Sequence, residues 1–197
     1  TRAEHESALN SIAKKGQGRN SLAESRDSVS GGVKGQRPLR LLIIGRNITM
    51  RTHSPNETRE LAKRLAKELR RGDVLLLWGD LGAGKSEFTR GLAQGLGVTA
   101  TVTSPSFTIL NVYDDGRIPL YHFDWYRLNS VEELYEMGME EFLGGDGVAV
   151  VEWPSQCPEA IPETHLAIRL TPVDETTRDV TITPMGEFRE ISLEEEQ

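Results

Sequence analysis

The segment Gly79–Ser86, with the sequence GDLGAGKS, constrains the fold of this chain more than any other. It matches the phosphate-loop pattern G-x-x-x-x-G-K-[ST] at every position. The apolar run 74–78 before it is typical of a buried strand, and the residues from Glu87 onward favour a helix. In this order, backbone N–H groups can close around a phosphate at a helix N-terminus. The segment therefore predicts a bound nucleoside triphosphate.

Two side chains at the end of this loop have chemical roles in that prediction. Lys85 is expected to reach the β- and γ-phosphates. Ser86 supplies a hydroxyl for Mg²⁺, a hard cation that keeps most of its waters and takes few protein oxygens. The competing interpretation is a glycine-rich turn with an exposed lysine, which the flanking strand and helix disfavour.

Hydrophobic periodicity and capping patterns place further elements around the loop. Residues 54–57 form a capping box with proline at the first helical position, so a helix is expected to begin there and to end near Gly72. A second capping pattern at 130–133 predicts a short helix. The other expected elements are strands at 48–52, 107–113, 118–123, 148–151, 165–170 and 178–183, a hairpin turn at 114–117 and a short helix at 139–143.

This alternation of strands and helices predicts an α/β fold. We expect a three-layer P-loop NTPase-like domain over residues 46–184, with a mostly parallel central sheet and antiparallel additions. A chain of 197 residues with 37% hydrophobic content can bury one such core. Residues 1–45 are rich in Ser, Gly, Lys and Arg, so a disordered or non-native basic tail is expected there, and residues 185–197 are expected to form an acidic tail.

Charge is divided unevenly along the chain. Residues 1–49 carry nine Lys and Arg against four Asp and Glu, a net of +5, whereas residues 50–197 carry fourteen against twenty-six, a net of −12. An acidic surface repels a phosphate backbone, so strong direct binding of nucleic acid by the folded part is not expected. A nucleotide pocket and a protein partner fit this balance better.

The sequence also bears on the compartment. No apolar run approaches the length of a membrane span, so no membrane association is expected. The single cysteine, Cys157, excludes an internal disulfide and fits a reducing compartment, which makes the cytoplasm the expected location. Without an evident partner histidine, this thiol is expected to be inert.

Acidic residues at strand ends are the candidates for metal binding and catalysis. Ligands of open α/β sheets bind outside the C-terminal ends of the strands. Glu152 follows four apolar residues, the Walker B arrangement that aims a carboxylate at Mg²⁺ beside Ser86. Asp124 ends another run and is a candidate for binding the metal through water or for orienting the attacking water. The alternative for each is an ordinary solvated or ion-paired acid.

Two further features leave alternatives open. Residues 103–108 carry several hydroxyls, which suits a switch loop that senses the γ-phosphate, and equally a plain strand rich in threonine. Trp153 and Tyr126 are aromatic side chains beside the candidate acids, where core packing is the alternative to a functional role.

Four sequence blocks together resemble the TsaE family, the small ATPases of bacterial tRNA threonylcarbamoyladenosine synthesis. They are Gly79–Ser86, Thr103–Phe107, His122–Leu128 and Val151–Pro154. The resemblance runs from about Thr52 to Thr183, and four blocks in the right order are far more specific than a phosphate loop alone.

The resemblance implies an ATPase that binds ATP and Mg²⁺ and works with the TsaB and TsaD proteins. Those proteins transfer threonylcarbamoyl to the adenosine beside the anticodon, so tRNA is contacted only indirectly through the complex. By motif match, the catalytic residues are Lys85, Asp124 and Glu152, and the metal is held by Ser86 and Glu152. The residues implied to lie at the nucleotide are Asn56, Asp80, Leu81, Gly82, Ala83, Gly84, Lys85, Ser86 and Arg178.

The sequence departs from the family pattern at two positions. The family usually has Thr-Thr after the lysine, whereas Ser86 and Glu87 follow here; the hydroxyl is kept, but Glu87 adds an anion near the phosphates unless it points to solvent. Trp125 replaces a commoner leucine, which is expected to alter packing around Asp124 without changing its carboxylate.

Two other functions use the same loop. A small-molecule kinase needs an acceptor pocket and usually a lid with several arginines, but only Arg117 and Arg127 occur between Arg90 and Arg169. A nucleotide-dependent binding module would hold ATP without significant turnover. We expect instead an ATPase that hydrolyses slowly alone and faster with its partners.

Overall fold

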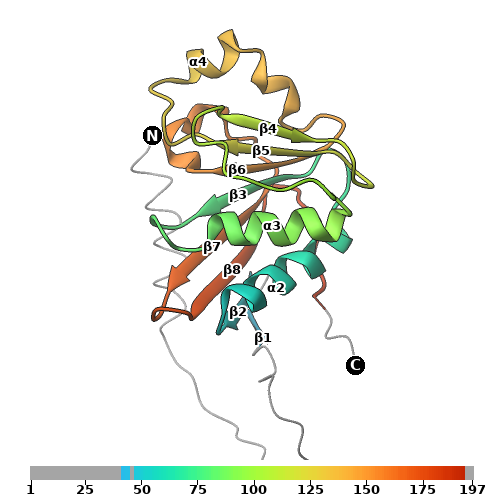
Figure 1. Cartoon of the computed structure of the whole chain (residues 1–197), viewed down its shortest axis with the longest axis vertical. Coiled ribbons are helices and arrows are strands. Elements are labelled where there is room, and N and C mark those ends of the chain that lie inside the picture. The colour runs from blue at the N-terminus through green and yellow to red at the C-terminus, as the bar shows by residue number, and fades with distance from the viewer. Residues whose placement is uncertain (1–40, 45–46, 194–197) are drawn as a thin grey trace, which may run out of the picture. The chain divides into compact units, whose positions relative to one another are not determined.

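The computed structural model describes residues 41–44 and 47–193, with side chains from residue 47 onward. The described strands form one eight-stranded sheet in the order β1-β2-β8-β7-β3-β6-β5-β4 (Figure 1). Their bounds are β1 Leu41–Ile44, β2 Asn47–Thr52, β3 Val74–Trp78, β4 Leu110–Tyr113, β5 Leu120–Asp124, β6 Val148–Glu152, β7 His165–Pro172 and β8 Arg178–Met185. The helices are α2 Pro55–Glu68, α3 Lys85–Leu96 and α4 Val131–Glu136, with 3₁₀ turns η1 Met139–Phe142, η2 Pro154–Gln156 and η3 Pro158–Ala160.

The centre of the sheet is parallel. Strand β3 pairs in parallel with β7 and with β6, and β6 pairs in parallel with β5. Antiparallel pairs add β8, β2 and β1 on one side and β4 on the other. The predicted α/β P-loop architecture, a parallel centre with antiparallel additions, is confirmed.

Strand β3 is buried on both faces, as its unbroken apolar run predicts. Leu75 and Leu77 pack into a core with α2 and α3 on one face, whereas Val74 and Leu76 pack into a second core on the other. The second core lies under α4 and the 3₁₀ turns and contains Cys157. The sheet is therefore the middle of three layers. The side chains of its central strands are buried between the two outer layers.

The predicted capping box starts α2. Ser54 Oγ accepts a hydrogen bond from Glu57 N at 3.1 Å, and Glu57 Oε2 accepts one from His53 N at 2.8 Å. The first bond satisfies an N–H group of the first helical turn, and the second ties the residue before the N-cap to the helix. The second predicted cap differs, because the Ser130 side chain makes no capping hydrogen bond to α4.

Helices α2 and α3 approach each other at two glycines. A Cβ atom at Gly91 would lie 2.2 Å from Arg59 O and 2.8 Å from Ala62 Cβ, and one at Gly95 would lie 2.5 Å from Lys63 O. Glycine in a helix interior costs about 1 kcal/mol relative to alanine, so these two residues are explained by packing rather than propensity. They hold the backbone of α3 directly against α2.

Replacing Gly91 by alanine is expected to destabilise the protein by about 2 kcal/mol or more, because the added methyl group meets backbone rather than a flexible side chain. Chemical denaturation monitored by circular dichroism measures this. Gln94→Ala, on the exposed side of the same helix, is the matched control and should leave stability unchanged within about 0.5 kcal/mol. Equal stability of the two variants would contradict the close contact.

Segment 101–108 is irregular, so its interpretation as a threonine-rich strand is wrong. The predicted strand 107–113 begins only at Leu110, and Phe107 is largely exposed. The proline at position 105 explains the irregular course, since it has no N–H to donate to a ladder. The turn between β4 and β5 spans 114–119, because Tyr113 pairs with Leu120.

The two ends of the predicted domain extend further than expected. Strand β1 lies within the range 1–45 that we assigned to a tail, while residues 1–40 and 45 lie outside the described residues. In the predicted acidic tail, Phe188, Ile191 and Leu193 are buried in the core beside α2 and α3. Arg189 Nη2 pairs with Asp73 Oδ2 at 2.6 Å. Residues 185–193 therefore pack as part of the domain.

Candidate functional site

The phosphate loop leaves β3 and enters α3 through glycines in unusual backbone conformations. Gly79, Gly82 and Gly84 have φ values of 147°, 78° and 104°. A Cβ at Gly79 would also lie 2.6 Å from Leu170 O, so no other residue fits there without displacement. Gly84 is the N-cap of α3 and provides no side-chain acceptor. The N-terminus of α3 thus has no side-chain cap from its N-cap residue, which leaves its first N–H groups available to a phosphate.

Lys85 is buried at the start of α3, with 5% of its surface exposed. Its Nζ donates to Gly79 O at 2.7 Å and to Asp80 O at 2.9 Å. The ammonium also lies 3.9 Å from the centre of the Trp153 ring. Burial lowers the pKa of Lys85 from its ordinary value, and the carboxylates of Glu152 and Asp124 oppose this shift. A buried cation close to two carboxylates is therefore the electrostatic centre of the site.

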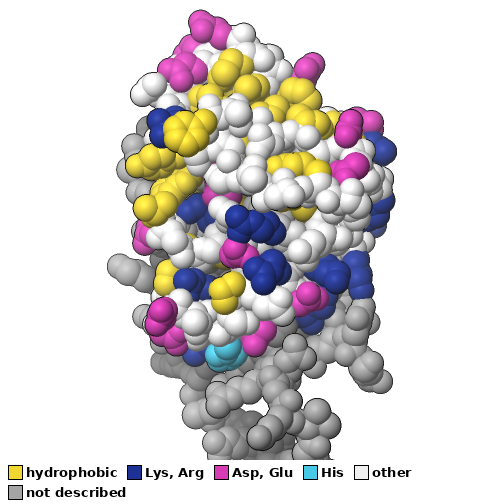
Figure 2. Space-filling model, viewed as in Figure 1, with side chains coloured by type: hydrophobic (Ala, Val, Ile, Leu, Met, Phe, Trp, Pro, Cys, Tyr) yellow, Lys and Arg dark blue, Asp and Glu magenta, His cyan; other side chains and the backbone are white. Residues whose placement is uncertain are grey.

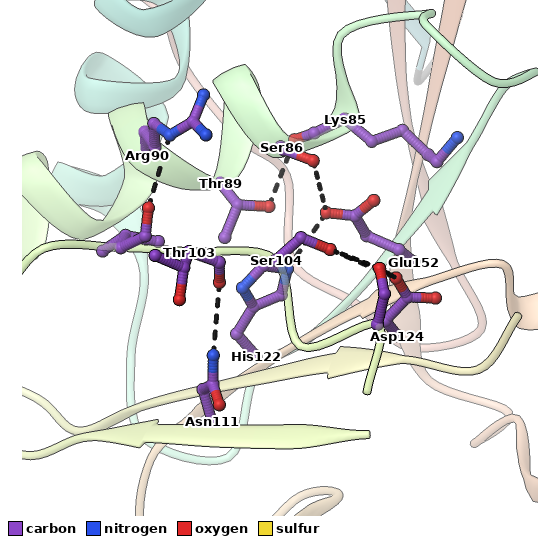
Figure 3. Close-up of polar contacts among 12 residues, drawn as sticks. Lys85, Ser86, Thr89, Arg90, Thr103, Ser104, Asn111, His122, Asp124 and Glu152 are labelled. Carbon is purple, nitrogen blue, oxygen red and sulfur yellow. Dashed lines mark hydrogen bonds and ion pairs between the residues drawn. The ribbon is translucent and has the colours of Figure 1, made fainter. Parts of the chain in front are cut away.

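Glu152 ends β6 beneath the first turn of α3, and 3% of its surface is exposed. Its Oε1 accepts a hydrogen bond from Ser86 Oγ at 3.3 Å and lies 3.0 Å from His122 Nε2 (Figure 3). The predicted neighbourhood of Ser86 and Glu152 is present in the structure.

Asp124 ends β5 and pairs in register with Glu152 of the adjacent parallel strand. Its Oδ2 accepts hydrogen bonds from Ser106 Oγ at 2.6 Å and Ser104 Oγ at 3.2 Å, and its Oδ1 accepts one from Tyr126 N at 3.0 Å. Two serines of the irregular 101–108 segment thus hold the Asp124 carboxylate in place through hydrogen bonds. Neither acid is solvated, because both are buried and hydrogen-bonded.

One cavity of about 540 Å³ collects these groups. The predicted site residues that line it are Leu81, Gly82, Gly84, Lys85, Ser86, Asp124 and Glu152. Asp80 and Ala83 belong to the same loop and contribute carbonyl oxygens to Lys85 and Arg178. Asn56 lies at the start of α2, where its Oδ1 accepts a bond from Arg59 Nη2 at 3.3 Å. Its predicted nucleotide contact is outside this cavity and stays a prediction.

Arg178, at the start of β8, is directed at the phosphate loop. Its guanidinium donates to Ala83 O at 3.0 Å and Gly82 O at 3.3 Å. The same group donates to carbonyls of the β7–β8 turn, at Asp174 and Thr177, each at 2.9 Å. Five N–H donors in a planar fork can bridge two loops in this way. The arginine holds the loop through its backbone, while its predicted direct contact with nucleotide stays a prediction.

Arg178→Ala is expected to weaken ATP binding about tenfold, because the loop loses the donors that hold its carbonyls in place. Isothermal titration calorimetry with ATP measures the change. Arg51→Ala is the matched control, since Arg51 lies on the neighbouring strand β2 and forms a partly exposed ion pair with Asp179. Unaltered ATP affinity of the Arg178 variant would contradict this role.

Glu87 does not add an unpaired anion to the pocket. Its carboxylate forms ion pairs with Arg59 of α2 and Arg90 of α3. Lys and Arg side chains gather over these helices in Figure 2, with acidic side chains among them. The two arginines therefore offset the charge that replaces the second threonine of the family pattern.

Several residues near the site carry contacts that sequence reasoning left without a role. Ser104 and Ser106 were predicted only as part of a hydroxyl-rich stretch, and His122 was given no function. Trp153 has φ of 59°, uncommon for a bulky residue and typical of strained positions at functional sites. Trp125 is fully buried and packs edge-on against Phe123, with the two ring centroids 6.3 Å apart.

Cys157 is remote from this chemistry. It is fully buried in the second core, and burial raises the pKa of its thiol to about 11. A protonated, buried thiol is a poor nucleophile.

The described residues contain no group of three or more His, Cys, Asp or Glu side chains that could hold a metal ion. Magnesium in nucleotide sites needs only one or two protein oxygens, because waters and phosphates supply the rest. Ser86 Oγ and Glu152 fit that limited requirement. Also among the described residues, no helix has the length and hydrophobicity to cross a bilayer.

Comparison with known proteins agrees with the geometry. Residues 52–180 match the family model described as threonylcarbamoyl adenosine biosynthesis protein TsaE. The chain belongs to the TsaE family. A Bacillus subtilis TsaE is 43% identical over 150 residues, covering 76% of this chain and 94% of the relative. A Treponema pallidum TsaE is 39% identical over 131 residues, covering 66% and 96%. Both relatives are named tRNA threonylcarbamoyladenosine biosynthesis proteins.

A solved structure shares the TsaE fold seen here. The crystal structure of Bacillus subtilis YdiB superposes with a TM-score of 0.63 and 41% sequence identity, covering 71% of this chain and 86% of that one.

Proposed function

We propose that this TsaE-family protein binds ATP with Mg²⁺ and hydrolyses it in the biosynthesis of threonylcarbamoyladenosine in tRNA, acting together with TsaB and TsaD. One observation carries the nucleotide part of the proposal. Lys85, Ser86, Asp124 and Glu152 come from three separate segments and face a single cavity at the start of α3. A phosphate loop, a hydroxyl and two carboxylates in this arrangement suit phosphoryl transfer to water.

Each side chain has a distinct part in the proposal. Lys85 would neutralise charge on the β- and γ-phosphates, exchanging its bonds to the Gly79 and Asp80 carbonyls for phosphate oxygens. Ser86 and Glu152 would hold Mg²⁺, which supplies charge neutralisation when bound. Asp124 would orient or deprotonate the attacking water, since a carboxylate near the γ-phosphate end can accept a proton.

The contacts around Asp124 support slow turnover by the isolated protein. Its Oδ2 accepts hydrogen bonds from Ser104 and Ser106, and its Oδ1 accepts one from Tyr126 N, so most of its acceptor sites are in use. Release of the serine hydroxyls would free Oδ2 for the attacking water. A loop that nucleotide or a partner can rearrange suits such control.

The charge of the folded part supports indirect contact with tRNA. Residues 50–197 carry a net charge of −12, which opposes association with a polyanion. The protein partners would supply the tRNA-binding surface in this proposal. The reaction belongs in the cytoplasm, where a free thiol such as Cys157 stays reduced.

The deciding experiment counts phosphate released for each ATP bound, with and without the TsaB and TsaD proteins. We expect slow release alone and at least about a tenfold increase with both partners, because partners often complete a phosphoryl-transfer site. Equal rates with and without them would contradict the partnership. Stoichiometric binding without release under either condition would favour the nucleotide-dependent binding module, and transfer of phosphate to a small acceptor would favour a kinase.

A further inference from the structure

His122 is a buried polar side chain that the proposed reaction does not yet use. It lies in the middle of β5, two residues before Asp124, and its surface is fully buried. A histidine inside a parallel strand costs desolvation unless its ring nitrogens find partners. Here the partner is Glu152, from the neighbouring strand β6, whose carboxylate lies between Ser86 and the imidazole in Figure 3.

The two hydrogen bonds on Glu152 fall on the same oxygen. Oε1 lies 3.0 Å from His122 Nε2 and 3.3 Å from Ser86 Oγ, and among the described residues Oε2 accepts no hydrogen bond. A carboxylate can only accept, so Nε2 must carry the ring proton. The His122 ring thereby fixes Oε1, which leaves Oε2 free of hydrogen bonds from the residues that the structure describes, in a residue that lines the cavity together with Lys85 and Ser86.

The other ring nitrogen supports this assignment. His122 Nδ1 is buried and has no hydrogen-bond partner among the described residues. An imidazole retained only for packing or for a general polar network would gain from pairing both nitrogens. Within the described part of the chain, the ring instead makes one hydrogen bond, to the carboxylate proposed for Mg²⁺.

We propose that His122 is the positioning residue of Glu152: its Nε2–H fixes Oε1, so that Oε2 is held toward the divalent cation of the nucleotide complex. The assignment rests on the proposed function, because it gives His122 a role only if Glu152 serves the metal. Hydrogen bonds of this kind to a ligating carboxylate set its orientation, and their loss typically costs about 10–100-fold in metal affinity.

Two amide variants of different length separate positioning from packing. The amide of Gln reaches about as far from Cβ as Nε2 does, whereas that of Asn reaches only the position of Nδ1. His122→Gln should therefore keep Mn²⁺ affinity within about threefold of the wild type, and His122→Asn should weaken it about tenfold or more. Mn²⁺ binding to the ADP-bound protein, followed by electron paramagnetic resonance, measures both. ADP affinity without metal should stay the same in both variants, and thermal unfolding confirms that they fold.

A double-mutant cycle tests whether His122 acts through Glu152. Glu152→Gln alone should weaken Mn²⁺ binding, and adding His122→Asn should weaken it by less than about twofold more, because residues that act through one contact are not additive. Full additivity, or equal Mn²⁺ affinities of the Gln and Asn variants, would overturn the positioning role. Unchanged Mn²⁺ affinity in Glu152→Gln would instead overturn the metal role of Glu152 in the proposed function.

A measurement without metal or nucleotide tests the contact between His122 and Glu152 independently of the proposed metal role of Glu152. Long-range ¹H–¹⁵N correlation spectra of ¹⁵N-histidine-labelled protein should show His122 protonated at Nε2 only. Glu152→Gln should shift the Nε2 resonance, whereas the matched substitution Glu133→Gln on α4 should not. Protonation at Nδ1 in the wild-type protein would overturn the contact itself, whatever the metal does.

Discussion

Lys85→Ala is expected to lower ATP hydrolysis by about 100-fold or more, measured as phosphate release in the presence of TsaB and TsaD. The ammonium is the cation that the phosphate loop contributes to the cavity at the start of α3, which Arg127 also lines. Its loss would remove the charge proposed to neutralise the phosphates, and it removes a cation that interacts with Glu152 and Asp124. ATP affinity, measured by calorimetry, should fall as well.

Lys63→Ala is the control for this variant. Lys63 is an exposed lysine of α2 that pairs with Glu60 at 3.9 Å, so its removal changes net charge without touching the site. Circular dichroism establishes that the Lys85 variant is folded. Undiminished turnover would remove the phosphate loop from the mechanism, whereas reduced turnover in both variants would indicate a general effect of charge.

Asp124→Asn is expected to lower turnover by about 100-fold while ATP binding changes little. Asparagine has nearly the same size; its Oδ1 can accept the bond from Tyr126 N, and its Nδ2 can donate to the Ser106 hydroxyl where Oδ2 now accepts, so the side chain stays held in place. It cannot take a proton and carries no charge for the attacking water. The loss should therefore appear in kcat rather than in ATP affinity.

The exposed acid Asp115 provides the matched control for Asp124. It lies in the β4–β5 turn, where its Oδ2 accepts bonds from Thr99, and Asp115→Asn should leave turnover unchanged. Comparing kcat and ATP dissociation constants across the two variants measures the difference. A fall in ATP affinity that accounts for the whole loss in Asp124→Asn would assign this residue to binding instead of hydrolysis.

Much of the framework could be predicted because its signals are local. The phosphate loop, the strand before it and the run at 148–151 each carry a pattern within a few residues. Strand ends then place Asp124 and Glu152 at one edge, because parallel strands present their C-termini together. The family resemblance assigned catalytic and metal-binding roles that residue spacing alone did not decide. The comparisons with known proteins confirmed the family.

The unpredicted part consists of contacts between segments distant in sequence. Nothing near Arg178 shows that it bonds to carbonyls 95 and 96 residues earlier. The pairing of Glu87 with Arg59 likewise depends on how α2 packs against α3. In the sequence, His122 is a single polar residue in an apolar strand. Its partner Glu152 becomes evident only when β5 and β6 are paired. Such contacts depend on register and helix packing, which periodicity alone does not determine.

The glycine contact between α2 and α3 has a consequence for how the pocket responds to its occupant. Because backbone meets backbone at Gly91 and Gly95, the helix that begins with Lys85 cannot slide without displacing its neighbour. The opposite wall is the irregular 101–108 segment, attached to Asp124 by serine hydroxyls. We therefore expect any rearrangement that distinguishes ATP from ADP to occur in the 101–108 segment, where a protein partner could detect it, rather than in α3.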